Sequence, residues 1–270
     1  MLVGDEYRYA LTFELDDNRI VLKDRVYLLP KKASDGQKFK EADAEGISFS
    51  DDFFYLVGSH GRNKEGKKQD SRYFVYRIRA QALKDGDLGT EDEVSDAVEV
   101  SSKLEDLLDH KEVLKDPNQL APEHGGTNIE GIAVQHDKLF VGFRGPLPDS
   151  QALIGETSVR RAFDEAQGDI ELHPVDLGEG QSIRDLVAYE DRLLILSGPQ
   201  DRQGGKAAVY QWNPNGGPSK LADLNPAGSP ARQPETLMVL STSNNIVRCL
   251  VFDDGDVPLN PRIYEIPIGQ

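Results

Sequence analysis

Short runs of alternating apolar and polar residues cover much of the chain and predict β-strands. Residues 9–14 and 19–29 alternate on either side of a polar turn at 16–18, a pattern typical of a hairpin with one buried face. Further strand-like runs follow along the chain, at 71–79, 170–177, 207–212, 220–224 and 262–268. The pattern predicts an all-β chain built largely from hairpins.

Four of the predicted hairpins open with a similar acidic phrase. The phrases occupy residues 43–47 (DAEGI), 128–132 (NIEGI), 183–186 (IRDL) and 233–237 (QPETL). After each comes a polar turn and an apolar strand, at 54–60, 139–144, 193–198 and 247–253. A fixed acidic position in successive hairpins is typical of a radial repeat, in which every repeat sends one residue to a shared axis. The repeat therefore predicts a β-propeller with Glu45, Glu130, Asp185 and Glu235 around its centre.

The spacing of the phrases predicts the number of blades. The later intervals suit one four-stranded blade each, whereas the interval from Glu45 to Glu130 is much longer. We therefore expect a single domain over residues 1–270 with about five blades, or alternatively six, and an insertion near 81–125. Residues 102–115 of the insertion place leucines at helical spacing, with a serine before them as a plausible cap. These leucines are Leu104, Leu107, Leu108 and Leu114.

The N-terminal residues predict an incomplete first blade. Residues 3–4 (VG) match 57–58 and 141–142 (both VG), so Met1 would fall inside the second strand of a repeat. Two explanations remain open. Either the C-terminal segment supplies a closing strand, or sequence upstream of Met1 is missing.

Composition narrows the possible functions. The net charge of −16 argues against nucleic-acid binding, because phosphate neutralisation needs a basic face. Cys249 is the single cysteine, so neither an intrachain disulfide nor a cysteine zinc cluster can form. No stretch approaches the roughly 20 apolar residues of a membrane span, and the first residues lack a leader pattern. We expect a soluble cytoplasmic protein that has no membrane partner.

Several phrases together resemble a bacterial family known as domain of unknown function 3616. They are DxEGI at 43–47, GSHxR at 58–62, NIEGIA at 128–133, GFRGPL at 142–147 and IRDL at 183–186. The resemblance follows the order of the family and covers nearly the whole chain. It implies a propeller-like fold and brings no established activity. A looser similarity extends to propellers with Glu-Gly motifs, such as esterase-like phytases and the gluconolactonase group, but so short a motif does not transfer their catalysis.

The repeat predicts one polar funnel. Antiparallel pairing puts the start of each inner strand beside the end of the next strand, and blades direct these ends towards one mouth of the channel. Carboxylates suit Ca²⁺ or Mg²⁺, so Glu45, Glu130, Asp185 and Glu235 are candidate metal ligands. Arginines can bind a phosphate or carboxylate. The candidate ligand-binding residues are Asp43, Arg62, Asn128, Arg144 and Arg184, and His60 is the candidate acid or base. Alternatively, the acids accept backbone N–H groups and clamp the blades together.

Three functions fit this funnel. The first is a binding or sensing module for a small polar or anionic ligand, with Ca²⁺ or Mg²⁺ as a candidate cofactor. The second is a metal-dependent hydrolase of phosphate esters or lactones, in which His60 activates a metal-bound water. The third is a scaffold that binds protein partners through the rim and the 81–125 insertion. The sequence does not decide whether the protein is an enzyme.

Overall fold

The strands of the chain form a series of antiparallel sheets that follow one another in sequence. The computed structural model describes residues 6–16, 19–33, 35–165, 168–200, 206–224, 233–253 and 261–269. Within this part, one two-stranded, three four-stranded and one three-stranded sheet occur. Strands adjacent in sequence pair with each other in every sheet, as the hairpin pattern predicted.

The sheets have the following strands. The first holds β1 (Tyr9–Asp16) and β2 (Arg19–Tyr27). The second holds β3 (Ala44–Ser50), β4 (Phe53–Gly58), β5 (Val75–Arg79) and β6 (Val98–Ser101). The third holds β7 (Asn128–Gln135), β8 (Lys138–Gly145), β9 (Ala152–Ser158) and β10 (Glu171–Val175). The fourth holds β11 (Gln181–Tyr189), β12 (Arg192–Pro199), β13 (Ala208–Asn213) and β14 (Gly217–Asp223). The fifth holds β15 (Pro234–Ser243), β16 (Ile246–Asp253) and β17 (Arg262–Pro267).

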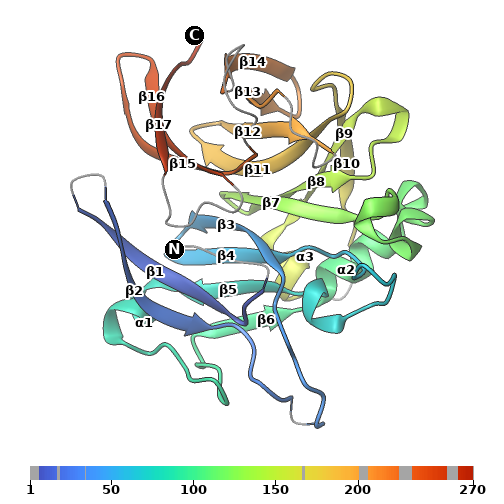
Figure 1. Ribbon diagram of the computed structural model, residues 1–270, viewed down its shortest axis with the longest axis vertical. Helices are drawn as coiled ribbons and strands as arrows, with labels where there is room; N and C mark the ends of the chain where they lie inside the picture. Colours follow the sequence, from blue (N-terminus) through green and yellow to red (C-terminus); the bar gives the residue numbers. More distant parts are fainter. Residues whose placement is uncertain are drawn as a thin grey trace.

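The sheets are arranged as the blades of a β-propeller. The inner strands β3, β7, β11 and β15 lie next to one another in that order, and the remaining strands of each sheet extend outwards (Figure 1). The all-β propeller prediction is confirmed. The number of blades stays a prediction, because segments between the sheets fall outside the described residues.

Apolar side chains fill the layers between consecutive sheets. Ala10 and Val26 of the first sheet pack with Leu56 of the second, and the next layer joins Val57 to Val141 of the third sheet. Two further layers join the third sheet to the fourth and the fourth to the fifth. The second, third and fourth blades therefore bury both of their faces, which explains why their inner and second strands read as nearly continuous apolar runs.

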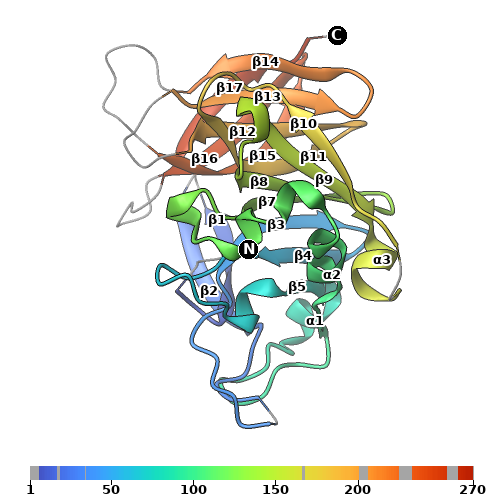
Figure 2. The same ribbon diagram turned by 90° about the vertical axis from the view of Figure 1, so that its right-hand side faces the viewer.

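The insertion after β5 is partly helical, but it is shorter than expected. It contains α1 (Ala80–Asp85) and α2 (Lys103–Asp109), together with short 3₁₀ turns. All four leucines that the sequence places at helical spacing are buried. Residues 98–101 of the predicted insertion instead form β6, the outermost strand of the second blade. Helix α2 lies beside α3 (Val159–Phe163) at the edge of the third blade (Figures 1 and 2).

The first sheet has two described strands. Within the described residues, β17 pairs with β16 alone, so this C-terminal strand completes its own sheet instead of joining β1 and β2. The segment at residues 3–4 that suggested an incomplete blade lies outside the described residues. No helix among the described residues is long and apolar enough to cross a membrane.

Candidate functional site

A β-bulge recurs at the start of each of the four inner strands. The pairing of β3 with β4 passes from Ala44 to Gly46, and the pairing of β7 with β8 passes from Ile129 to Gly131. The residues skipped are Glu45 and Glu130. Strand β15 skips Glu235 in the same way. A bulge leaves the extra residue out of the ladder and re-aims its side chain, which explains why these glutamates recur at one position.

In the fourth blade the bulge residue is Arg184, and not Asp185. The pairing of β11 with β12 passes from Ile183 to Asp185. The alignment of Asp185 with the glutamates was therefore wrong by one residue. The four equivalent positions hold Glu45, Glu130, Arg184 and Glu235, so a cation replaces one acid at the centre of the propeller.

The residue after the bulge faces the neighbouring inner strand at very short range. A Cβ on Gly46 would lie 2.9 Å from the backbone nitrogen of Ile132, and one on Gly131 would lie 2.7 Å from that of Leu186. Glycine is needed at both positions because the adjacent backbone leaves no room for a side chain. The Glu-Gly motif thus combines a central carboxylate with a close contact between blades.

The substitution Gly131→Ala is expected to lower the free energy of unfolding by about 1–3 kcal/mol, the usual cost of overpacking. The new methyl group would meet backbone atoms of Asp185 and Leu186, which cannot move independently of β11. Gly269→Ala is the matched control, since a Cβ at Gly269 meets no atom within 4 Å. Urea unfolding of both variants measures the difference. Equal stability of the two variants would contradict the close approach.

Asp185 clamps two blades together. Its Oδ1 accepts the backbone N–H of Leu186 at 2.8 Å and its Oδ2 accepts that of Leu237, in β15, at 2.9 Å. Burial raises the pKa of Asp185 well above 3.8, and the nearby charge of Glu130 acts in the same direction, while the two N–H donors oppose the rise. This geometry agrees with the alternative given by the sequence, in which an acid accepts backbone N–H groups and holds two blades together.

Glu130 is the hub of an ion-pair network at the centre, which we call the bulge network. Its Oε1 accepts hydrogen bonds from Asn128 Nδ2 at 2.9 Å and from Arg144 Nη1 at 2.7 Å. Its Oε2 accepts one from Arg184 Nη1 at 3.0 Å. The same Nη1 reaches Glu235 Oε1 at 3.3 Å. Both oxygens of Glu130 are therefore satisfied by side chains of this chain.

The two arginines of the network differ in exposure. The side chain of Arg184 is 1% exposed and that of Arg144 is 16% exposed. Arg144 Nε also donates to the backbone oxygen of Gln200 at 3.1 Å. Burial alone would lower the pKa of Arg144. The charge of Glu130 and its hydrogen bond to Arg144 raise this pKa, as do the charges of Glu235 and Glu45, and the net result is a raised pKa. Arg144 thus stays charged, at the more open side of the network.

Asp43 belongs to a second cluster in the second blade. Its Oδ2 accepts a hydrogen bond from the hydroxyl of Ser59 and forms an ion pair with Arg72 Nη1 at 3.0 Å. Arg72 is also paired with Glu41. The charge of Glu45 raises the pKa of both Arg72 and Arg144, so Glu45 acts electrostatically on this cluster and on the bulge network.

His60 and Arg62 are engaged away from the bulge network. His60 is buried, has a φ of +51° and places Nδ1 2.9 Å from the backbone oxygen of Gly58. Desolvation by burial lowers its pKa to about 4. Arg62 donates to the backbone oxygens of Asn118 and Gly66 and to Gln119 Oε1. Arg62 therefore ties two loops together.

The arrangement favours internal charge compensation. In the bulge network two carboxylates, those of Glu130 and Glu235, face two guanidinium groups, whereas the sequence predicted a ring of four acids. Among the described residues, no group of three or more His, Cys, Asp or Glu side chains is placed to hold a metal ion. The metal role of Glu45, Glu130, Asp185 and Glu235 stays a prediction.

Sequence reasoning missed Ser59 and Arg72. Ser59 stands in the GSHxR phrase, directly before the histidine that drew attention, and Arg72 lies outside the repeated phrases. Arg72 comes after a polar loop that carries none of the repeated phrases. No spacing rule connects it to Asp43, because the contact depends on how the loop returns to the blade.

The sequence profile of the family described as protein of unknown function (DUF3616) matches residues 6–85 and 67–225. No curated protein sequence matches the chain.

Several solved structures show distant similarity to the chain. A neuraminidase-like protein from A/bat/Guatemala/164/2009 is 11% identical with a TM-score of 0.37, over 82% of this chain and 53% of its own. The extracellular domain of a putative hybrid two-component system, BT4673, from B. thetaiotaomicron is 11% identical with a TM-score of 0.39, over 99% and 29%. A GH43 endo-arabinanase from Bacillus licheniformis is 9% identical with a TM-score of 0.29, over 83% and 92%. The chain thus spans about half of the first structure and less than a third of the second, and similarity this low transfers no activity.

Proposed function

Because the chain belongs to the DUF3616 family of proteins of unknown function, we propose a function from the site itself. The propeller is a binding module, and its central mouth receives a small polar or anionic ligand at Arg144. The observation that carries the proposal is the way Arg144 is held. Nε and Nη1 are fixed by Gln200 and Glu130, and Nη2 makes no hydrogen bond within the described part of the chain.

A guanidinium that is held through two of its nitrogens and belongs to a side chain that is 16% exposed is well suited to binding an anion. The Arg144 side chain is already ordered in the free protein, so it loses little conformational entropy when an anion binds. Carboxylate and phosphate groups are the anions that match its planar donors. The buried Arg184 below it does not compete for this role, because its terminal nitrogens are directed to Glu130, Glu235 and the backbone oxygen of Pro199.

The observations favour a binding module over a hydrolase. The hydrolase hypothesis needs His60 as a general base beside the carboxylates, and an efficient base has a pKa near the working pH. The pKa of His60 is lowered to about 4 and its ring packs against Tyr73 inside the second blade.

Thermal unfolding with small carboxylates tests the proposal. A ligand at a hundredfold excess over its dissociation constant stabilises the native state by roughly 2.7 kcal/mol, so succinate or citrate should raise the melting temperature by several degrees. Arg144→Gln should abolish the rise. Arg160→Gln is the control, because the Arg160 side chain is 70% exposed and the substitution makes the same change in charge.

A parallel titration with Ca²⁺ and Mg²⁺ tests the cofactor. A rise in melting temperature that Glu130→Gln removes would support a bound cation at the bulge network. No response to carboxylates or to divalent ions would contradict the small-ligand proposal and leave the scaffold as the remaining hypothesis.

A further inference from the structure

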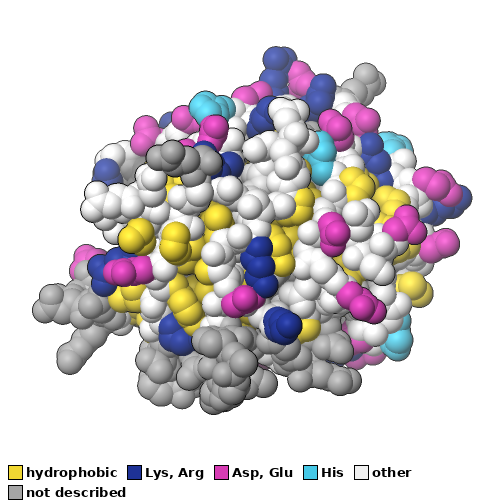
Figure 3. All heavy atoms as spheres, turned by 90° about the horizontal axis from the view of Figure 1, so that it is seen from above, with side chains coloured by type: hydrophobic (Ala, Val, Ile, Leu, Met, Phe, Trp, Pro, Cys, Tyr) yellow, Lys and Arg dark blue, Asp and Glu magenta, His cyan; other side chains and the backbone are white. Residues whose placement is uncertain are grey.

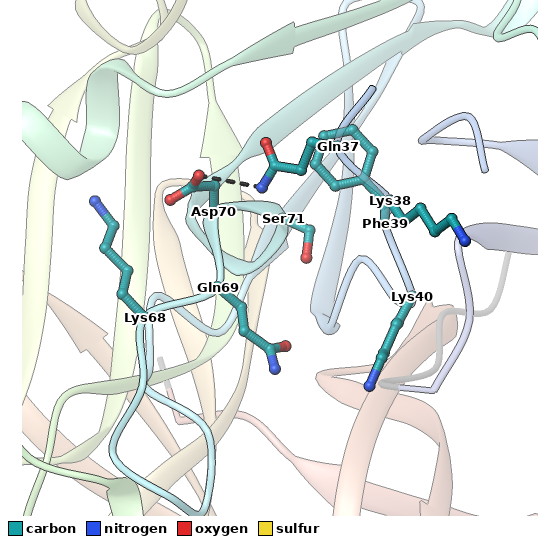
Figure 4. Close-up of a pocket in the computed structure, with 8 residues that line it drawn as sticks. All are labelled: Gln37, Lys38, Phe39, Lys40, Lys68, Gln69, Asp70 and Ser71. Carbon is teal, nitrogen blue, oxygen red and sulfur yellow. Dashed lines mark hydrogen bonds between the residues drawn. The ribbon is translucent and has the colours of Figure 1, made fainter. Parts of the chain in front are cut away.

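A cavity of about 200 Å³ lies between two polar segments of the second blade region, residues 37–40 and 68–71. Figure 4 shows their side chains around it. None of the lining residues belongs to the bulge network. The cavity is therefore a second candidate site.

The cavity lies in a basic part of an acidic protein. Residues 31–41 and 61–72 contain nine of the 31 Lys and Arg residues and only four acidic residues. The chain as a whole has a net charge of −16, and the face seen in Figure 3 mixes acidic and basic side chains around exposed apolar groups. An anion is repelled by the net charge of the protein and finds a locally positive surface here.

Lys38 and Lys40 supply this positive charge. Both are exposed and neither forms an ion pair with any residue in the described ranges. Lys68, the third lysine at the cavity, is already paired with Glu105 and lies 4.8 Å from the ring centre of Tyr73. Two ammonium groups thus remain available to a ligand.

Uncharged polar groups complete the lining. Gln69 accepts a hydrogen bond from Arg72 Nε at 3.2 Å through its Oε1, which leaves its NH₂ group to the cavity side. The side chains of Gln69 and Ser71 point into the space between the two segments (Figure 4). The one acid of the lining, Asp70, accepts a hydrogen bond from Gln37 Nε2 at 3.3 Å. The cavity therefore combines two cations with neutral donors.

The segment that bears the lysines is held in place. Lys38 forms a β-bridge with Lys32, and the backbone N–H of Phe39 donates to the oxygen of Lys31 at 3.2 Å. The ring of Phe39 packs edge-on against Phe74, with 6.4 Å between the ring centres. Because these contacts exist without a ligand, only the lysine side chains need to be ordered on binding.

We propose that this cavity binds a small ligand through a phosphate or sulfate group, which Lys38 and Lys40 contact. The shared chemistry is a tetrahedral oxyanion with two or more negative charges. Its oxygens accept charge-assisted hydrogen bonds from both ammonium groups, and Gln69 and Ser71 donate to the remaining oxygens. The proposal is independent of the ligand at Arg144, because the two sites share no residue.

Calorimetric titration of the full chain with pyrophosphate at low ionic strength tests the proposal. Lys38→Gln with Lys40→Gln should weaken binding about tenfold or more, because two hydrogen bonds to a charged group are lost. Lys64→Gln with Lys67→Gln is the matched control. It removes the same charge from the neighbouring loop, from residues that do not line the cavity, and should change the affinity less than about twofold.

Further measurements separate the remaining outcomes. Binding of pyrophosphate that Arg144→Gln abolishes and that the Lys38→Gln, Lys40→Gln protein retains would assign the ion to the central mouth and overturn the proposal. An equal loss in both lysine pairs would show a general charge effect and would also overturn it, as would no binding to the unaltered protein. Titrations with sulfate and with glucose 6-phosphate then distinguish a free inorganic ion from a phosphorylated metabolite.

Discussion

Replacing Arg184 by methionine is expected to lower the free energy of unfolding by about 3–5 kcal/mol, the usual cost of breaking a buried ion pair. Arg184 is 2% exposed and its Nη1 contacts both Glu130 and Glu235. Without it, the Glu130 carboxylate stays buried with one of its two charged partners, Arg144. Methionine fills much of the same volume, so the loss measures charge and hydrogen bonding more than packing.

A double-mutant cycle separates the ion pair from other effects. Arg184→Met combined with Glu130→Met should be less destabilising than the sum of the single variants, because the second substitution removes the stranded charge. Lys220→Met is the control, since Lys220 pairs with Asp223 at an exposed position and should change stability by less than about 1 kcal/mol. Urea unfolding followed by circular dichroism measures the unaltered protein and all four variants. Strict additivity of Arg184→Met and Glu130→Met would show that the two groups do not interact.

The order of the blades could be predicted from the sequence because each hairpin repeats one local pattern. Glu45, Glu130 and Glu235 stand at equivalent bulges, as their phrases suggested. In the third phrase an arginine precedes the acid, and matching by charge selected Asp185. A bulge is a feature of pairing between strands, so only the register with β12 identifies Arg184 as the equivalent residue.

The partners of the candidate residues could be predicted less well than their positions. His60 follows the second strand of its blade and Arg144 lies near the end of the equivalent strand. Arg144 binds Glu130, whereas His60 contacts Gly58 and Tyr73. The left-handed backbone of His60, with φ of +51°, redirects its side chain. Such a conformation depends on tertiary contacts and leaves no periodic signal in the sequence.

The stability of the protein is expected to fall by about 3 kcal/mol through His60 alone as the pH drops from 6.5 to 4. The pKa of His60 is lowered to about 4, and burial is the main cause. The hydrogen bond to Gly58 raises this pKa in part, and the charge of Lys68 lowers it further. In the unfolded chain the imidazole has its ordinary pKa near 6.5. Between these values the unfolded chain binds the proton and the native protein does not. The stabilisation is therefore present above pH 6.5 and lost as the pH falls towards 4.

His60→Asn should remove this part of the pH dependence, because asparagine does not titrate and tolerates a positive φ. The measured quantity is the change in unfolding free energy between pH 7.5 and 4.5, so any constant loss of packing cancels. His124→Asn, at an exposed histidine, should retain the dependence of the unaltered protein. If His60→Asn also retains it, the imidazole takes up a proton in the folded state. A base that is accessible near neutral pH would then favour the hydrolase hypothesis over the binding module.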